Sequence, residues 1–276
     1  MRLTGAAAFS GEPARDSDAA VAVLRRAVEL GVDHLDTSGF YFHPGPDGPI
    51  RSNELVRRAL APYDDGLTIV TKVGPRRTPD GEFAPFAAPG DLRAEVEQNL
   101  RELGLETLDV VNLRMGGSRP VTDHVGALVE LRDAGLLRHI GVSAVNLDQL
   151  EEARGVTEVV CVQNRYAVDA RHPASDALVE RCGELGIAFV GYFAIAGDRK
   201  EEAGDGSGET DAAVAEVAAR HGVRPAQVRI AWTLAQGPHV LAIPGTGDLG
   251  HLEENVASQD VELTVDDLSR LAGARH

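Results

Sequence analysis

The chain alternates short, wholly apolar runs with segments of helical periodicity almost from one end to the other. The apolar runs predict strands at residues 3–9, 34–36, 68–72, 109–113, 139–143, 159–162, 188–193 and 240–243. The periodic segments predict helices near residues 18–30, 51–61, 91–103, 122–134, 147–154, 174–185, 225–235 and 264–273. Short continuous apolar runs are typical of parallel strands that are buried on both faces. Eight strands alternating with helices predict an α/β fold, the closed (β/α)₈ TIM barrel, as one domain over residues 1–276.

A doubly wound dinucleotide-binding sheet is the main alternative for alternating strands and helices. It would carry the pattern G-x-G-x-x-G directly after the first strand. Gly5 and Gly11 have the wrong separation for that pattern, so we set this alternative aside.

The charge balance limits the partners of the chain. Its 276 residues carry 27 Lys and Arg against 43 Asp and Glu, a net charge of −16. Such a surplus of acid argues against a nucleic-acid groove and against an anionic membrane surface. No apolar run approaches the roughly 18 residues of a membrane span. The two cysteines, Cys161 and Cys182, fall in core-like segments, which is typical of a reducing compartment and predicts a cytoplasmic protein.

Two polar residues end predicted strands, and a third follows one of them closely. Asp36 and Lys72 end the runs at 34–36 and 68–72, and Tyr41 comes five residues after Asp36. A TIM barrel keeps its catalytic groups at the carboxyl ends of its strands. There an ammonium lowers the pKa of a neighbouring phenol, and a carboxylate holds the ammonium in place. The pattern therefore predicts a tyrosine proton donor.

These motifs resemble the aldo-keto reductase superfamily over roughly residues 2–273. Asp36-Thr37-Ser38-Gly39-Phe40-Tyr41 is similar to its D-T-[AS]-x-x-Y motif, and Thr71-Lys72-Val73-Gly74 to its T-K-[VI]-G motif. The resemblance implies hydride transfer from NADPH to an aldehyde or ketone of a small molecule, with NAD or no cofactor as open alternatives. It makes Asp36, Tyr41 and Lys72 catalytic. The nicotinamide and adenosine segments of the family match positions here that include Ser143, Gln163, Phe193, Gly245, Thr246, His251, Glu254 and Asn255.

Within the superfamily, the chain is most similar to the pyridoxal reductase group. The shared stretches are Thr71-Lys72-Val73-Gly74-Pro75-Arg76-Arg77 and Leu108-Asp109-Val110-Val111-Asn112-Leu113-Arg114. That group carries Asn-Leu-Arg where most relatives place a catalytic histidine, which makes Arg114 the fourth catalytic candidate. A guanidinium can stabilise a developing oxyanion, but it does not titrate as an acid or base.

Several cofactor positions depart from the family pattern. Ala144 follows Ser143 where relatives have Asn, and Asp198 falls in the loop that runs over the pyrophosphate. Asp248 lies where relatives place Ser or basic residues for the 2′-phosphate. An acid there suits a ribose hydroxyl, as in NAD sites, or caps a helix entered at Leu249. The hairpin that plugs the base of the barrel in the family has no counterpart ahead of residue 3.

Three functions therefore stay open. The first is a nicotinamide-dependent carbonyl reductase. The second is a barrel that has lost the nicotinamide and uses Asp36, Tyr41 and Lys72 for isomerisation, dehydration or ring closure. The third is a non-enzymatic binding subunit, against which the buried lysine argues. The nine histidines form no metal-ligand spacing, so we expect no metal site. Substrate identity, reaction direction and oligomeric state are not fixed by the sequence.

Overall fold

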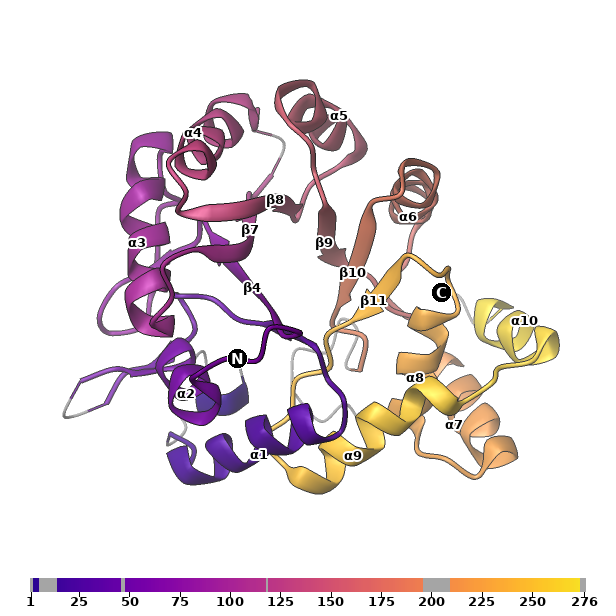
Figure 1. The fold of residues 1–276 in the computed structure, drawn as a ribbon. Coiled ribbons are helices and arrows are strands. Elements are labelled where there is room, and N and C mark those ends of the chain that lie inside the picture. The colour runs from indigo at the N-terminus through magenta and orange to yellow at the C-terminus, as the bar shows by residue number, and fades with distance from the viewer. Residues whose placement is uncertain (1, 5–13, 46–47, 118, 196–208, 274–276) are drawn as a thin grey trace. The chain divides into compact units, whose positions relative to one another are not determined.

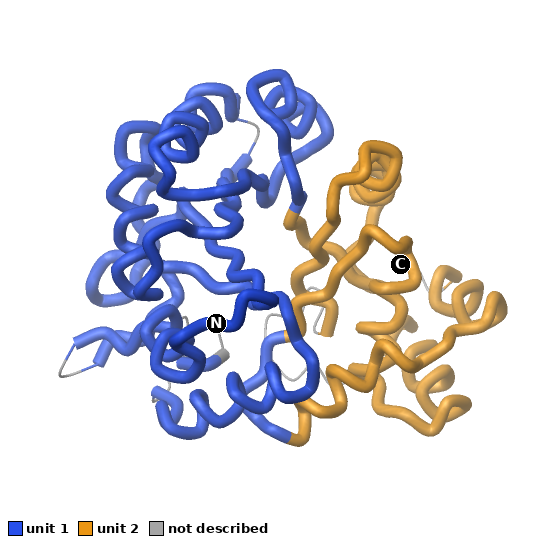
Figure 2. Tube along the Cα trace, viewed as in Figure 1, with its two compact units in different colours: residues 1–162, 245–249 blue, residues 163–244, 250–276 orange. Residues whose placement is uncertain are grey.

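A computed structural model describes residues 2–4, 14–45, 48–117, 119–195 and 209–273 of the chain. The chain forms two compact units, shown in Figure 2. Unit 1 comprises Met1–Val162 and Gly245–Leu249, and unit 2 comprises Gln163–Pro244 and Gly250–His276. Within the described part of the chain, no helix is both long enough and apolar enough to cross a membrane.

Unit 1 is built on parallel strands that pair in chain order. They are β1 (His34–Asp36), β4 (Thr68–Val73), β7 (Leu108–Arg114) and β8 (Leu137–Ser143), followed by the start of β9 (Cys161–Arg165). The register pairs Lys72 with Asn112 and Arg114 with Ser143. Polar residues from neighbouring strands therefore meet at one edge of this sheet.

Helices connect these strands and cover the outer side of the sheet, as Figure 1 shows. They are α1 (Ser17–Glu29), α2 (Ser52–Leu60), α3 (Leu92–Leu103), α4 (Thr122–Asp133) and α5 (Leu147–Val156). Each helix buries an apolar stripe, as Val96, Leu100 and Leu103 of α3 illustrate. Gly104 ends α3 in the left-handed conformation, with φ 70°, that glycine adopts without strain.

Unit 2 continues the strand–helix alternation. Its elements are the end of β9, α6 (Pro173–Leu185), β10 (Ala188–Tyr192), α7 (Glu209–His221), α8 (Pro225–Leu234), β11 (Val240–Ala242), most of α9 (Leu249–Ala257) and α10 (Val265–Gly273). Strands β10 and β11 pair in parallel. The core of this unit stacks Tyr166 on Trp232, with ring centroids 5.5 Å apart.

Most of the predicted elements are present, with three departures. The strand expected at residues 3–9 is wrong at its start, where Arg2–Thr4 forms a 3₁₀ turn, and residues 5–9 lie outside the described part. The strand expected at 159–162 is shifted to Cys161–Arg165. Helix α7 was not predicted. Its first residues, Glu209 and Thr210, end the polar segment 198–210 that we expected to form a loop, of which residues 198–208 are not described.

Two short hairpins interrupt the alternation in unit 1. The first pairs β2 (Phe42–His43) with β3 (Ile50–Arg51), directly after Tyr41. The second pairs β5 (Arg76–Arg77) with β6 (Phe83–Ala84), shortly after β4. The guanidinium of Arg77 joins them, because it donates to the carbonyl of Phe42 at 2.9 Å and lies 4.6 Å from the centre of that ring. Both hairpins therefore border the strand ends that carry Asp36 and Lys72.

Candidate active site

Asp36, Lys72 and Tyr41 lie together in unit 1. Lys72 Nζ is 2.6 Å from Asp36 Oδ1 and donates to the Thr37 carbonyl at 3.2 Å. The same ammonium lies 5.1 Å from the centre of the Tyr41 ring. Tyr41 and Lys72 are buried, with the Lys72 side chain only 1% exposed, and the Asp36 side chain is 9% exposed. A lysine at this depth stays charged only because its partners offset the loss of hydration.

Burial and charge act in opposite directions on these groups. Burial raises the pKa of Tyr41 above its ordinary value of 10.0, although Lys72 and Arg114 lower it. The expectation that the ammonium lowers the pKa of the phenol is therefore correct for Lys72 itself but wrong for the net shift. Burial lowers the pKa of Lys72, but Asp36 and Tyr41 together outweigh it, so that this pKa is raised. At neutral pH the site holds a protonated phenol above an ammonium.

The loop that carries Tyr41 is fixed at both ends. Tyr41 N donates to the Ser38 carbonyl at 3.0 Å, which closes a turn. The Tyr41 carbonyl accepts from the backbone N–H of Ser52, the first residue of α2, at 2.9 Å. Ser38 Oγ in turn donates to the carbonyl of Lys72 at 3.2 Å. The loop that carries the phenol is thus bonded to the backbone of β4, the strand that supplies Lys72.

Arg114 ends β7 next to the end of β4. Its backbone carbonyl packs against Gly74, where an added Cβ would collide with it. Gly74 also has φ +111°, so both its conformation and this close approach require glycine. Arg114 lies close enough to Tyr41 for its charge to lower the phenol pKa. Its expected role opposite a developing oxyanion stays a prediction.

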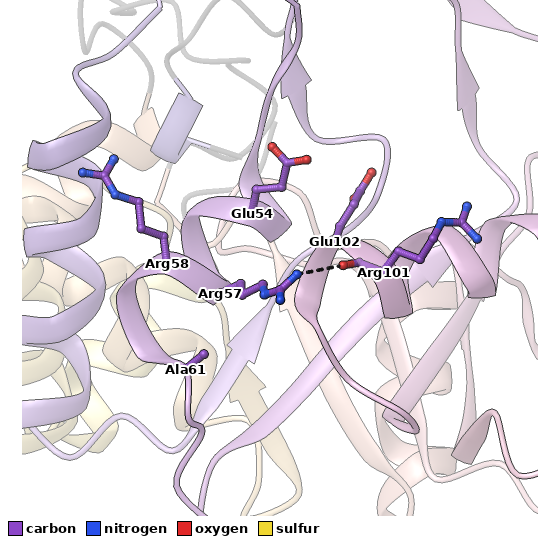
Figure 3. Close-up of a pocket in the computed structure, with 6 residues that line it drawn as sticks. All are labelled: Glu54, Arg57, Arg58, Ala61, Arg101 and Glu102. Carbon is purple, nitrogen blue, oxygen red and sulfur yellow. Dashed lines mark hydrogen bonds between the residues drawn. The ribbon is translucent and has the colours of Figure 1, made fainter.

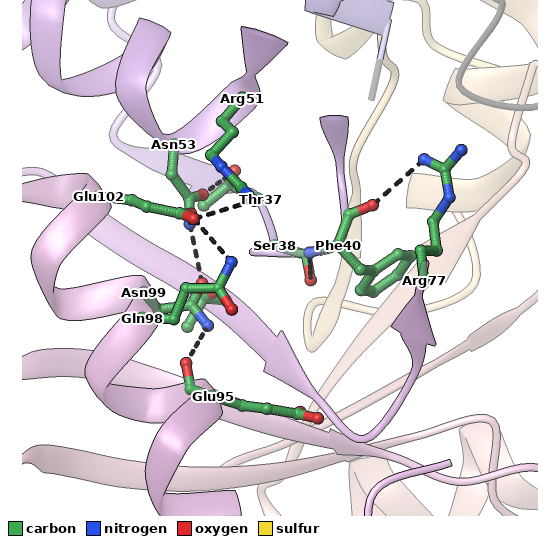
Figure 4. A network of polar contacts seen from close by, with 11 residues as sticks. Thr37, Ser38, Phe40, Arg51, Asn53, Arg77, Glu95, Gln98, Asn99 and Glu102 are labelled. Atoms are coloured by element: carbon green, nitrogen blue, oxygen red, sulfur yellow. Dashed lines mark hydrogen bonds and ion pairs between the residues drawn. The ribbon is translucent and has the colours of Figure 1, made fainter. Parts of the chain in front are cut away.

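A buried polar network, shown in Figure 4, begins at Thr37. Thr37 directly follows Asp36, which with Tyr41 and Lys72 forms the candidate catalytic trio. Thr37 Oγ1 donates to Asn53 Oδ1 at 2.7 Å, and Asn53 Nδ2 donates to Asn99 Oδ1 and to Glu102 Oε2, both at 2.9 Å. Arg51 completes the chain with an ion pair to Glu102 at 3.1 Å. Burial raises the pKa of Glu102, although Gln98 and Arg51 counteract it.

The outer end of this network opens onto a surface hollow between α2 and α3. The hollow has a volume of about 460 Å³ and is lined by Glu54, Arg57, Arg58, Ala61, Arg101 and Glu102 (Figure 3). Arg57 spans it by donating to the Arg101 carbonyl at 3.3 Å. Its charged lining is unlike the largely apolar lining of small-molecule sites. We therefore regard it as the solvated end of the network.

Ser143 ends β8 beside Arg114, and Ala144 directly follows the strand. Ser143 is fully buried, and its Oγ finds no hydrogen-bond partner among the described residues. Ala144 has φ 57°, a left-handed conformation that is uncommon for a residue with a Cβ. Asparagine tolerates that conformation better than alanine does. The backbone at Ala144 therefore has the conformation that suits the asparagine of the family, although alanine lacks the amide of that asparagine.

Gly245 and Thr246 precede α9 in unit 1. Thr246 Oγ1 accepts from the backbone N–H of Asp248 at 3.1 Å, which shapes the turn into the helix. The next residue, Gly247, lies against the guanidinium of Arg15, which would collide with a Cβ at this position. Arg15 was not among the predicted site residues, because nothing in the sequence links the start of α1 to this turn.

The other predicted cofactor residues belong to unit 2. Gln163 on β9 is 1% exposed, and Phe193 has φ 67° directly after β10. On α9, His251 is exposed and Glu254 forms an ion pair with Arg224 at 2.7 Å. Asn255 is 8% exposed, and its Nδ2 has no partner among the residues that the structure describes. Their roles toward a cofactor stay predictions.

Comparisons with known proteins identify the family. The Aldo/keto reductase family model matches residues 3–275. The chain belongs to the aldo/keto reductase family. It is 42% identical to pyridoxine 4-dehydrogenase of Escherichia coli (strain K12) over 280 residues, which cover 99% of this chain and 92% of that protein. The family and this similarity make it an NAD(P)H-dependent carbonyl reductase.

Solved structures of aldo-keto reductases agree in fold. A thermostable aldo-keto reductase in complex with the inhibitor epalrestat superposes with a TM-score of 0.80 at 28% identity, over 99% of this chain and 92% of that one. An aldo-keto reductase from Klebsiella pneumoniae in complex with NADPH gives 0.75 at 26% identity, over 92% of this chain and 84% of that one. The predicted α/β class, the (β/α)₈ TIM barrel, is confirmed by these similarities.

Proposed function

We propose that the chain reduces a small aldehyde or ketone with NADPH and that Tyr41 is the proton donor. The observation that carries the proposal is the buried contact of the Tyr41 ring with Lys72, whose ammonium is paired to Asp36 at 2.6 Å. NADPH, when bound, supplies the hydride that reduces the carbonyl carbon. The protein supplies the proton and the positive charge around it.

Each catalytic side chain has a distinct task. Tyr41 Oη donates its proton to the carbonyl oxygen as negative charge develops there. Because burial raises the pKa of Tyr41, the phenol carries that proton throughout the neutral range. Lys72 stabilises the phenolate that remains, and Asp36 keeps the ammonium in place. Arg114 adds a second positive charge near the same oxygen.

The residues present fit a nicotinamide cofactor. Ser143 Oγ and Asn255 Nδ2 are buried polar atoms without a partner among the described residues. Buried polar groups are normally hydrogen-bonded, and a ligand is one way to satisfy them. Ser143 would hold the nicotinamide carboxamide, and Asn255 would bind the adenosine. Gln163, Phe193, Gly245, Thr246, His251 and Glu254 complete the proposed contacts.

Arg15 favours NADPH over NADH. Its guanidinium lies against Gly247, in the turn where the family binds the adenosine ribose. Arginine binds phosphate through a planar, permanently charged group, which offsets the repulsion expected from Asp248. We therefore propose Arg15 as a contact for the 2′-phosphate.

The relative at 42% identity suggests the first substrate to try. It is named pyridoxine 4-dehydrogenase, and the carbonyl form of its alcohol substrate is the 4-aldehyde, pyridoxal. The proposed catalytic residues act on the carbonyl group and do not select the rest of the substrate. We therefore propose small aldehydes and ketones as the substrate class, with pyridoxal as the first compound to test.

Fluorescence titration with NADPH and NADH tests the cofactor directly. We expect NADPH to bind more tightly, and the Arg15→Ala variant to lose affinity for NADPH about tenfold with little change for NADH. Arg58→Ala, which removes a surface arginine paired with Asp18, is the matched control and should change neither. Deuterium at the transferred position of NADPH should appear in the alcohol product. Failure of both nucleotides to bind would favour chemistry without a cofactor.

A further inference from the structure

The catalytic loop and the catalytic strand are joined by Ser38, which donates to the Lys72 carbonyl, and by a second set of side chains that meets at Asn99. Asp36 and Tyr41 lie at the two ends of a loop after β1, whereas Lys72 lies on β4. The contact between Lys72 and Tyr41 depends on how this loop and this strand are held relative to each other. Asn99, in the middle of α3, bonds directly to Thr71 on this strand. It reaches the loop through Asn53 of α2, which accepts from Thr37.

Asn99 is 2% exposed, and both of its polar atoms are used. Its Oδ1 accepts from Thr71 Oγ1 at 2.5 Å and from Asn53 Nδ2 at 2.9 Å. Its Nδ2 donates to the carbonyl of Glu95, one turn earlier on α3, at 2.8 Å. The last bond fixes the amide on its own helix, so the oxygen is directed at β4 and α2.

The partners of Asn99 outside α3 are adjacent to the trio in the chain or one hydrogen bond away from such a neighbour. Thr71 directly precedes Lys72 on β4. Asn53 accepts from Thr37, which directly follows Asp36 and whose carbonyl accepts from Lys72. Gly39, two residues before Tyr41, packs on the Asn99 amide, since an added Cβ would lie 3.2 Å from Nδ2.

We propose that Asn99 is a positioning residue for the carbonyl reduction, because its side chain holds the Tyr41 loop and the Lys72 strand in register. The proposal rests on the catalytic roles of Tyr41 and Lys72 given above. Asn99 touches no reacting atom and acts only through Thr71, Asn53 and Gly39. A displacement of about 1 Å between catalytic groups can lower turnover roughly 100-fold.

Asn99→Leu removes both polar atoms in a side chain of similar size. We expect kcat to fall between 10-fold and about 100-fold, with the KM for the carbonyl and the Kd for NADPH changed less than threefold. Tyr63→Phe is the matched control, because it removes a 2.7 Å hydrogen bond to Leu103 at the end of the same helix. Its kcat should stay near that of the wild type.

Two milder variants keep the test decisive if Asn99→Leu does not fold. Thr71→Val removes one bond to Asn99 with a nearly isosteric side chain, and we expect a smaller loss of kcat with the same unchanged Kd. Asn99→Asp retains the accepting oxygen and donates to the Glu95 carbonyl only when protonated. Its kcat should therefore recover toward the wild-type value as the pH falls.

NMR of protein labelled at tyrosine Cζ reads the position of the phenol without any turnover. The chain has four tyrosines, and Tyr41→Phe assigns the signal of Tyr41. In the Asn99 and Thr71 variants, the Tyr41 signal should shift while those of Tyr166 and Tyr192 stay in place. An unmoved Tyr41 signal, or equal losses of kcat in Asn99→Leu and Tyr63→Phe, overturns the proposal. A wild-type protein that reduces no carbonyl would refute the proposed function instead, and the NMR result would still decide the role of Asn99.

Discussion

Two carboxylates with little exposure, Asp36 in unit 1 and Asp267 in unit 2, lie beside cationic side chains in different surroundings. Asp36 is 9% exposed and pairs with Lys72, whose ammonium also faces the Tyr41 ring. Asp267 is 2% exposed and pairs with Arg220 at 2.7 Å, while its other oxygen accepts from His221 at 2.8 Å and from Thr264. The Thr264 bonds cap the start of α10, a stabilising arrangement at helix termini.

The comparison shows what a buried ion pair says about function. Among the described residues, Asp267 of α10 pairs only with structural groups, Arg220 and His221, and so links α10 to the end of α7. The pair at Asp36 holds a cation next to a phenol that carries a transferable proton. A buried charge is therefore a functional sign only when its partner also faces a reactive group, and each of the following changes separates the two cases.

Lys72→Met should have the largest effect. It removes the ammonium that stabilises the Tyr41 phenolate and that pairs with Asp36. We expect a loss of at least 10³-fold in kcat/KM, the scale of removing a catalytic electrostatic group. Breaking a buried pair also costs about 3–5 kcal/mol of unfolding free energy. The double variant Asp36→Asn, Lys72→Met should regain much of that stability and none of the activity, as measured by urea unfolding and steady-state kinetics. Recovered activity in the double variant would contradict the assigned roles.

Tyr41→Phe should lower kcat by roughly 10²–10⁴-fold, which is the usual contribution of a positioned proton donor. The unfolding free energy and the Kd for NADPH should change little, because the ring and its contact with Lys72 remain. In the wild type, reduction should stay level through neutral pH and fall only above pH 10, since the phenol pKa is raised from 10.0 and the protonated form is active. A loss of activity centred near pH 7 would point to a different donor.

The sequence predicted the trio well because the signal is local. Asp36 and Lys72 end apolar runs, and parallel strands bring such ends to one edge of a sheet. Tyr41 follows Asp36 by five residues, and that spacing leaves it in the loop above this edge. The geometry confirms that the three side chains lie together, although their roles stay proposals.

The sequence could not predict the residues that support the trio from another element. Asn99 and Glu102 are the buried polar residues of an otherwise ordinary amphipathic helix, and periodicity does not say which partners lie opposite them. Arg15 approaches Gly247 from a segment 232 positions earlier, a contact that only the folded chain creates. Helix α7 was missed for a different reason. Its alanines and valines at 213, 214, 217 and 218 have helical spacing, but the polar segment before them drew the prediction toward a loop.

Asp267→Asn tests the other half of the comparison. Burial raises the pKa of Asp267, but the His221 and Thr264 bonds and the charge of Arg220 lower it from 3.8 to about 2. A carboxyl whose pKa is depressed in the folded state stabilises the fold above its unfolded pKa, and this stabilisation is lost as the pH falls through the folded pKa. This lowering of the Asp267 pKa corresponds to roughly 2 kcal/mol of unfolding free energy.

We therefore expect Asp267→Asn to lower the unfolding free energy by roughly 2 kcal/mol at pH 7. The difference from the wild type should shrink between about pH 4 and pH 2, because the wild-type carboxyl becomes neutral there. Urea unfolding across this range measures it, and kcat/KM at pH 7 provides the control. A large loss of kcat/KM in the folded variant would remove the distinction between the two carboxylates.

Ser143→Ala should have the smallest effect on stability, and the sign of this effect with and without NADPH is informative. In the protein without cofactor, removal of a buried hydroxyl that has no partner among the described residues should leave stability unchanged or slightly higher. With NADPH, the lost hydrogen bond should weaken binding by about 1 kcal/mol, or roughly fivefold in Kd. Thermal unfolding with and without saturating NADPH measures both. Opposite signs in the two states mean that the hydroxyl is kept for the ligand, whereas a loss of stability without NADPH would mean that Ser143, like Asp267, serves the fold.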